Sequence, residues 1–106
     1  MKAVMILHNQ GIGDEVMESL DRLGIRGFTR WNEVQGRGTR TGEPHMGSHV
    51  WPSLNSAVLT IIPDDRVPEL LRAVHAIDRR VEQEGIRAFV WTVEDGGPPS
   101  GAEKGV

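Results

Sequence analysis

The chain has 106 residues, which fits one domain large enough to bury a hydrophobic core. Hydrophobic residues make up 38% and charged residues 25%, an ordinary balance for a globular protein. The net charge of −3 argues against a nucleic-acid binder, which needs a basic surface for phosphates. The absence of cysteine excludes disulfides and thiolate metal sites.

The first apolar run, Ala3 to Leu7, predicts a strand over residues 2–8. It is too short for the apolar region of a signal peptide or for a membrane span. It also stops at His8-Asn9-Gln10 without a small-residue cleavage site. We therefore expect a cytoplasmic protein that is not embedded in a membrane.

Five more elements follow from apolar periodicity and from Gly and Pro punctuation. The pattern predicts a helix over 14–23, a strand over 28–34, a strand over 56–62, a helix capped by Asp64 and Asp65 and ended by Gly85, and a strand over 86–93. Residues 1–93 then form one domain. Residues 94–106 are rich in Gly, Pro and charge and predict a disordered tail.

The order β-α-β-β-α-β predicts an α+β, ferredoxin-like fold with a four-stranded antiparallel sheet and both helices on one face. The other face should then alternate polar and apolar residues if it meets water. The strands do not alternate in this way: residues 3–7 and 57–62 are apolar on both faces, and Phe89, Trp91 and Val93 oppose Ile86, Ala88 and Val90. We therefore expect a second copy of the chain to cover the open face.

A loop of about twenty residues separates the second and third strands, and such loops are usually functional. Its first part, Gly36-Arg37-Gly38-Thr39-Arg40, combines backbone freedom with guanidinium donors, so it is a candidate for holding a phosphate or carboxylate. The alternative is a flexible loop base with solvated arginines.

The second part of the loop, His45-Met46-Gly47-Ser48-His49, predicts a transition-metal site with His45, Met46 and His49 as ligands. Imidazole suits zinc or copper, and the methionine sulfur favours Cu(I). Glu43, His8 or a second subunit would complete the coordination. The alternative is that the histidines are solvated and that Met46 and Trp51 cover a neighbour.

No enzyme motif is present: the chain has no Gly-x-Ser-x-Gly, no phosphate-binding Gly-Lys-Ser/Thr loop and no cysteine nucleophile. The acidic pairs Asp14-Glu15 and Asp64-Asp65 lie at predicted helix starts, where they complement the helix dipole. Trp31 and Trp91 lie on predicted strands and are expected to pack in a core or an interface. His8 is expected to be a hydrogen-bonded histidine at a strand end.

Three segments resemble the PII family of nitrogen regulatory proteins. Residues 24–29 (GIRGFT) and 33–38 (EVQGRG) resemble the entry into the PII T-loop, and residues 62–67 (IPDDRV) resemble the PII junction between the third strand and the second helix. The resemblance covers residues 2–93. It implies a homotrimer with ligand clefts between subunits that signals by rearranging the T-loop rather than by catalysis.

The chain departs from PII proteins where they hold phosphates. The place of their Gly- and Lys-rich stretch reads Glu82-Gln83-Glu84-Gly85, and Glu94-Asp95-Gly96-Gly97 stands where they carry basic residues. The loop also has no tyrosine for uridylylation. The divergent PII-like proteins fit better, and some of these associate with metal efflux or transport systems.

Three functions follow as hypotheses. The first is a metal-responsive regulator using His45, Met46 and His49, whose loop 36–52 contacts a transporter or efflux partner through Glu43 and Trp51. The second is a sensor of an adenine nucleotide such as ATP or ADP, or of another anion, using Thr29, Gly36, Arg37, Gly38 and Arg40. The third is a structural interaction module without a ligand.

Overall fold

The computed structural model describes residues 1–35, 54–80 and 85–94. The strands are β1 (Lys2–Asn9), β2 (Thr29–Val34), β3 (Asn55–Ile62) and β4 (Ile86–Thr92), and the helices are α1 (Gly13–Arg22) and α2 (Val67–Arg80). Two short 3-10 turns, Gln10–Ile12 and Asp64–Arg66, precede the two helices. No helix among the described residues is long and apolar enough to cross a membrane.

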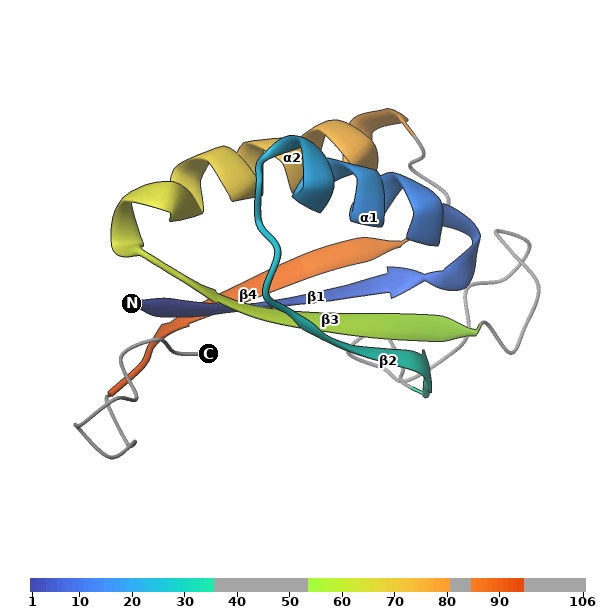
Figure 1. The fold of residues 1–106 in the computed structure, drawn as a ribbon. Coiled ribbons are helices and arrows are strands. Elements are labelled where there is room, and N and C mark those ends of the chain that lie inside the picture. The colour runs from blue at the N-terminus through green and yellow to red at the C-terminus, as the bar shows by residue number, and fades with distance from the viewer. Residues whose placement is uncertain (36–53, 81–84, 95–106) are drawn as a thin grey trace, which may run out of the picture.

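The four strands form one sheet in the order β2-β3-β1-β4, and all neighbouring pairs are antiparallel. Both helices lie on the same face of this sheet (Figure 1). Each helix connects two strands that have a third strand inserted between them, which is the ferredoxin-like arrangement. The predicted fold class is therefore confirmed.

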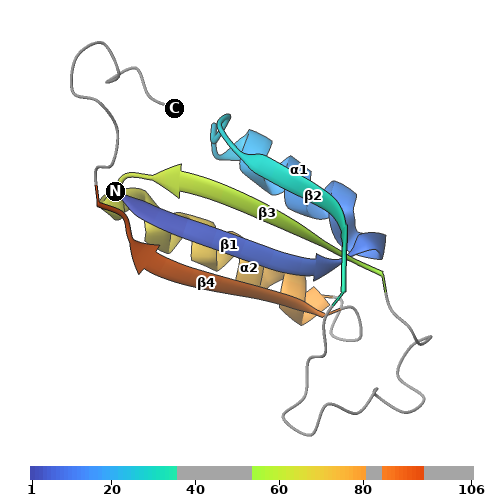
Figure 2. The same cartoon turned by 90° about the horizontal axis from the view of Figure 1, so that it is seen from below.

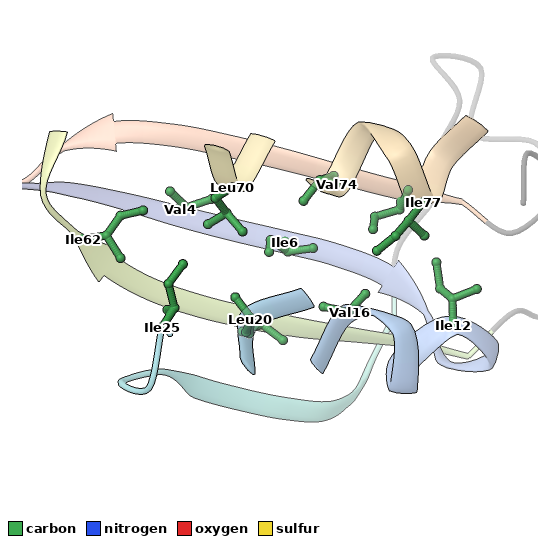
Figure 3. Close-up of a cluster of buried hydrophobic side chains, with 12 residues drawn as sticks. Val4, Ile6, Ile12, Val16, Leu20, Ile25, Ile62, Leu70, Val74 and Ile77 are labelled. Atoms are coloured by element: carbon green, nitrogen blue, oxygen red, sulfur yellow. The ribbon is translucent and has the colours of Figure 1, made fainter. Parts of the chain in front are cut away.

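The core lies between the helices and the sheet (Figure 3). Successive strand residues point to opposite faces, so alternate positions of β1 and β3, such as Val4, Ile6 and Val58, reach the helices. Leu20 of α1 and Leu70 of α2 are each 1% exposed and pack against them. Burial of such side chains contributes roughly 1.5–3 kcal/mol each and fixes the helix orientation.

The predicted bounds of β1, α1, β2, β3 and β4 each move by one residue in the structure. Gly24 ends α1 as expected, with a φ of 73° that favours glycine, and its N–H donates to the Asp21 carbonyl. Asp64–Arg66 form a 3-10 turn ahead of α2 rather than its cap, and the Asp64 carboxylate lies 2.9 Å from the terminal amine of Met1. The predicted C-terminal end of α2 lies outside the described residues.

Figure 2 views the sheet from the side away from the helices. Exposed apolar side chains lie on this face. The strand register places Thr29, Leu59, Met5 and Phe89 in one row across the four strands. On this open face Trp31, Phe89 and Trp91 are 43%, 50% and 46% exposed. The two tryptophans therefore do not pack in the core of the protomer. That they pack in an interface between subunits stays a prediction.

Candidate ligand-binding site

A cleft of about 460 Å³ opens beside the start of β2 and the end of β3. Its walls are the connection from α1 to β2, residues 24–29, and the last half of β3, residues 59–62, with Arg66 at one end. Because β2 is an edge strand, no further strand within residues 1–35, 54–80 and 85–94 closes this side of the sheet. The cleft is therefore open to a ligand or to a second copy of the chain.

The wall formed by residues 24–29 is held in place from both sides. The N–H of Ile25 donates to the Leu20 carbonyl at 2.9 Å, and the Ile25 side chain is buried in the core. The Thr60 hydroxyl, buried on β3, donates to the Gly27 carbonyl at 2.6 Å. These bonds fix the backbone of the wall before any ligand binds, which lowers the entropy cost of binding.

The lining combines apolar, hydroxyl and cationic groups. Phe28 and Ile61 present apolar surface and are 43% and 38% exposed. Thr29 supplies a hydroxyl that can donate and accept hydrogen bonds. Arg26 and Arg66 supply positive charge. This mixture fits a ligand with a flat apolar part and an anionic part.

The guanidinium of Arg66 is already engaged by the protein. It donates to the Leu23 carbonyl at the end of α1, and it pairs with the Glu69 carboxylate at 2.6 Å. These contacts tie the 3-10 turn before α2 to α1 across the end of the cleft. Arg66 therefore forms part of the cleft wall, and its guanidinium is less available to a ligand.

Gln10 joins the two ends of the loop between β2 and β3. Its backbone N–H donates to the Leu54 carbonyl at 2.9 Å, directly before β3. Its side-chain amide donates to the Asn32 carbonyl, next to the irregular end of β2. The Ser56 hydroxyl donates to the same Asn32 carbonyl at 2.7 Å. The base of the loop is therefore held by hydrogen bonds that connect its two ends through Gln10.

His8 lies at the end of the sheet where this loop begins, and it is 1% exposed. Its Nδ1 donates to the Asn9 carbonyl at 2.8 Å, which leaves Nε2 unprotonated in the neutral ring. Nε2 has no hydrogen-bond partner among the described residues, so only one of the two ring nitrogens fits the expected hydrogen-bonded histidine. Burial lowers the pKa of His8, and the positive charge of Arg30 lowers it further, against the Asn9 hydrogen bond.

We expect the depressed pKa of His8 to make the fold less stable in mild acid. Below a pH of about 6.5 the unfolded chain takes up a proton that the folded chain refuses, so the free energy of unfolding falls as pH falls. Melting temperatures between about pH 7.5 and about pH 5 measure this loss. His8→Gln should flatten the profile, and His75→Gln, on the exposed surface of α2, should not. An unchanged profile in His8→Gln would contradict the assignment.

The structure places two of the residues named for the predicted sites, Thr29 and His8, and His8 is buried near the end of β1. Thr29 lines the cleft, whereas the other predicted anion-binding residues, Gly36, Arg37, Gly38 and Arg40, lie outside the described residues. The predicted metal ligands His45, Met46 and His49, and the predicted partner contacts Glu43 and Trp51, lie outside them as well. Within residues 1–35, 54–80 and 85–94, no group of three His, Cys, Asp or Glu side chains could hold a metal ion.

Sequence reasoning did not single out Arg26, Thr60 or Gln10. Arg26 belongs to the same short segment as Thr29, and an exposed arginine beside a candidate ligand residue is a signal that could have identified it. A threonine in an apolar strand gives no such signal for Thr60, because its partner Gly27 is 33 residues away.

Comparisons with known proteins agree with this architecture. The profile of the family "Nitrogen regulatory protein P-II" matches residues 1–96. CPII, a nitrogen regulatory PII-like protein from Thiomonas intermedia K12 bound to ADP, AMP and bicarbonate, superposes with a TM-score of 0.68 and 19% identity. The match covers 92% of this chain and 93% of CPII. Another CPII structure, bound to ADP and bicarbonate, is 22% identical with a TM-score of 0.68, covering 92% and 89%.

A PII-like signalling protein from Thermus thermophilus superposes with a TM-score of 0.58 and 22% identity, over 85% of this chain and 83% of that protein. No curated protein matches the chain. At these identities the solved structures show the fold alone, whereas the family profile spans 96 of the 106 residues. The chain therefore belongs to the nitrogen regulatory protein P-II family.

Proposed function

We propose that this protein is a cytoplasmic, homotrimeric regulator that binds an adenine nucleotide in the cleft beside β2. The observation that carries the proposal is the lining of that cleft, where apolar surface, the Thr29 hydroxyl and the exposed guanidinium of Arg26 meet. An adenine ring needs a flat apolar surface, and its phosphates need cations. Structures of CPII, which share the fold, contain ADP and AMP with bicarbonate or acetate.

We propose a nucleotide as the ligand, whereas the loop sequence alone favoured a metal ion. The three predicted metal ligands lie outside the described residues, and within the described residues no group of three His, Cys, Asp or Glu side chains could hold a metal ion. The ligands of CPII support the nucleotide or anion alternative better than the metal hypothesis. The reason for the difference is physical: the imidazole and thioether groups were visible in the sequence, whereas the cleft exists only after folding.

The apolar open face of the sheet supports the homotrimer. Trp31, Phe89 and Trp91 present more exposed aromatic surface on this face than a lone water-facing sheet would be expected to carry. Further copies of the chain are a suitable cover, because head-to-tail contacts repeated around a threefold axis close into a ring. In such an assembly the cleft at the edge strand β2 lies where a neighbouring subunit could close it.

The proposed output is a change in the loop that follows β2. A ligand shifts a loop between two states only if it contacts the states differently. The cleft and the loop share strand β2, with Thr29 at its start and the clamped Asn32 near its end. The loop, with Glu43 and Trp51, would present the changed surface to a protein partner such as a transporter. This activity is regulatory rather than catalytic.

Isothermal titration calorimetry with ADP, AMP and ATP tests the proposal. We expect binding of ADP with one site per protomer, and a several-fold weaker affinity for Thr29→Val, which keeps the shape and removes the hydroxyl. Thr92→Val on β4, a strand that contributes no cleft residue, is the matched control. If no adenine nucleotide binds while Cu(I) or Zn(II) binds and is lost in the double variant His45→Ala/His49→Ala, the metal hypothesis is correct instead. A failure to bind any of these ligands favours the structural module.

A further inference from the structure

Among the described residues, Arg26 is the cation of the cleft that has no protein partner. Its side chain is exposed, and it makes no ion pair or hydrogen bond with another described residue. Arg66, the second cation in the lining, donates to the Leu23 carbonyl and pairs with Glu69. A guanidinium already paired with a carboxylate attracts an anion less than an unpaired one does. Of the two arginines, Arg26 therefore has the donors and the charge to offer an anionic ligand.

The backbone on either side of Arg26 is fixed. Ile25 is buried at 4% exposure with its N–H on the Leu20 carbonyl, and the Gly27 carbonyl accepts the Thr60 hydroxyl. Only the side chain of Arg26 has to be ordered when a ligand binds. Ordering one long side chain costs rotamer entropy, which a charge-assisted hydrogen bond to a phosphate offsets.

The sequence offers little positive charge at the place where PII proteins carry a Gly- and Lys-rich stretch. Residues Glu82-Gln83-Glu84, which follow α2, are acidic or neutral, and the whole chain carries a net charge of −3. A nucleotide phosphate brought near that segment would meet like charge. Within the described lining of the cleft, Arg26 is then the cation available to the phosphates.

We infer that Arg26 binds the phosphate of the nucleotide and makes the cleft select nucleotides over the uncharged nucleoside. This inference rests on the proposed function, because it assigns a role within the same cleft. It predicts that removing the guanidinium reduces affinity for AMP and ADP and leaves affinity for adenosine unchanged. A single charge-assisted contact at an exposed site should change the dissociation constant by about tenfold.

The experiment measures dissociation constants of adenosine, AMP and ADP by calorimetry for the wild type, Arg26→Ala and Arg26→Lys. Arg72→Ala is the matched control, because Arg72 is also an exposed arginine but lies on α2 outside the cleft. We expect Arg26→Ala to bind AMP and ADP about tenfold more weakly, Arg26→Lys to recover part of the loss, and Arg72→Ala to match the wild type. Adenosine should bind all four proteins equally.

Two outcomes separate this inference from the proposed function. If the wild type binds ADP and Arg26→Ala binds it equally well, Arg26 is not the phosphate ligand and the nucleotide sensor stands. The inference is also overturned if the preference for AMP over adenosine disappears in Arg87→Ala instead, since Arg87 is an exposed cation on the opposite edge strand β4. If the wild type binds none of the three compounds, the proposed function fails together with the inference.

Discussion

Phe89→Glu is expected to convert the proposed trimer into monomers. Phe89 lies on β4 in the row that crosses the open face of the sheet, opposite Met5, and it is 50% exposed in the protomer. In a trimer that packs these faces together, each copy would bury an unpaired carboxylate in apolar surroundings. Such a burial costs several kcal/mol for each charge, and a closed trimer contains three of them. Light scattering after size-exclusion chromatography measures the mass directly.

Because Phe89 is exposed in the protomer, the variant should keep its fold and its far-ultraviolet circular dichroism. Trp91→Glu tests the same face from the next outward position of β4, opposite Ala3, and should give the same result. His75→Glu places the same charge on the exposed surface of α2 and should remain a trimer. A wild type that is monomeric at micromolar concentration, or a trimeric Phe89→Glu, would show that the open face is not the interface.

The order of helices and strands was predictable because each element depends on local periodicity. The apolar stripe of α1, with Val16 and Leu20, and the position of Gly24 determine that helix within one residue. The alternation of residues along β4 also predicted correctly which side chains face away from the helices. The register pairs Ala88 with Ile6 and Val90 with Val4 on the helix side, so the residues between them lie on the open face. Residues close in sequence carry these features, and the tertiary structure changes only their ends.

The cleft and the loop base were not predictable for the opposite reason. Arg66 contacts Leu23 across 43 residues, and Gln10 contacts Asn32 across 22 residues. In both cases a side chain donates to a backbone carbonyl, and any residue type can supply that carbonyl. The predicted metal site shows the converse limitation, since His45, Met46 and His49 have suitable chemistry but their arrangement depends on the folded loop.

Thr60→Val should weaken both the fold and the ligand site. Thr60 is 2% exposed, and its hydroxyl donates to the Gly27 carbonyl at 2.6 Å. Valine has nearly the same shape, so the variant removes the hydrogen bond and leaves the Gly27 carbonyl without this donor. The cost is about 1–3 kcal/mol in the free energy of unfolding, measurable by chemical denaturation.

The same variant should reduce affinity for ADP, because the Gly27 carbonyl anchors the wall of the cleft that carries Arg26 and Thr29. A wall that must be ordered during binding adds an entropy cost that the wild type does not have. Thr60→Ser retains the hydroxyl and should keep most of the affinity even though it loses a buried methyl group. If both variants lose stability equally and bind ADP as tightly as the wild type, the hydrogen bond supports the fold without preparing the cleft.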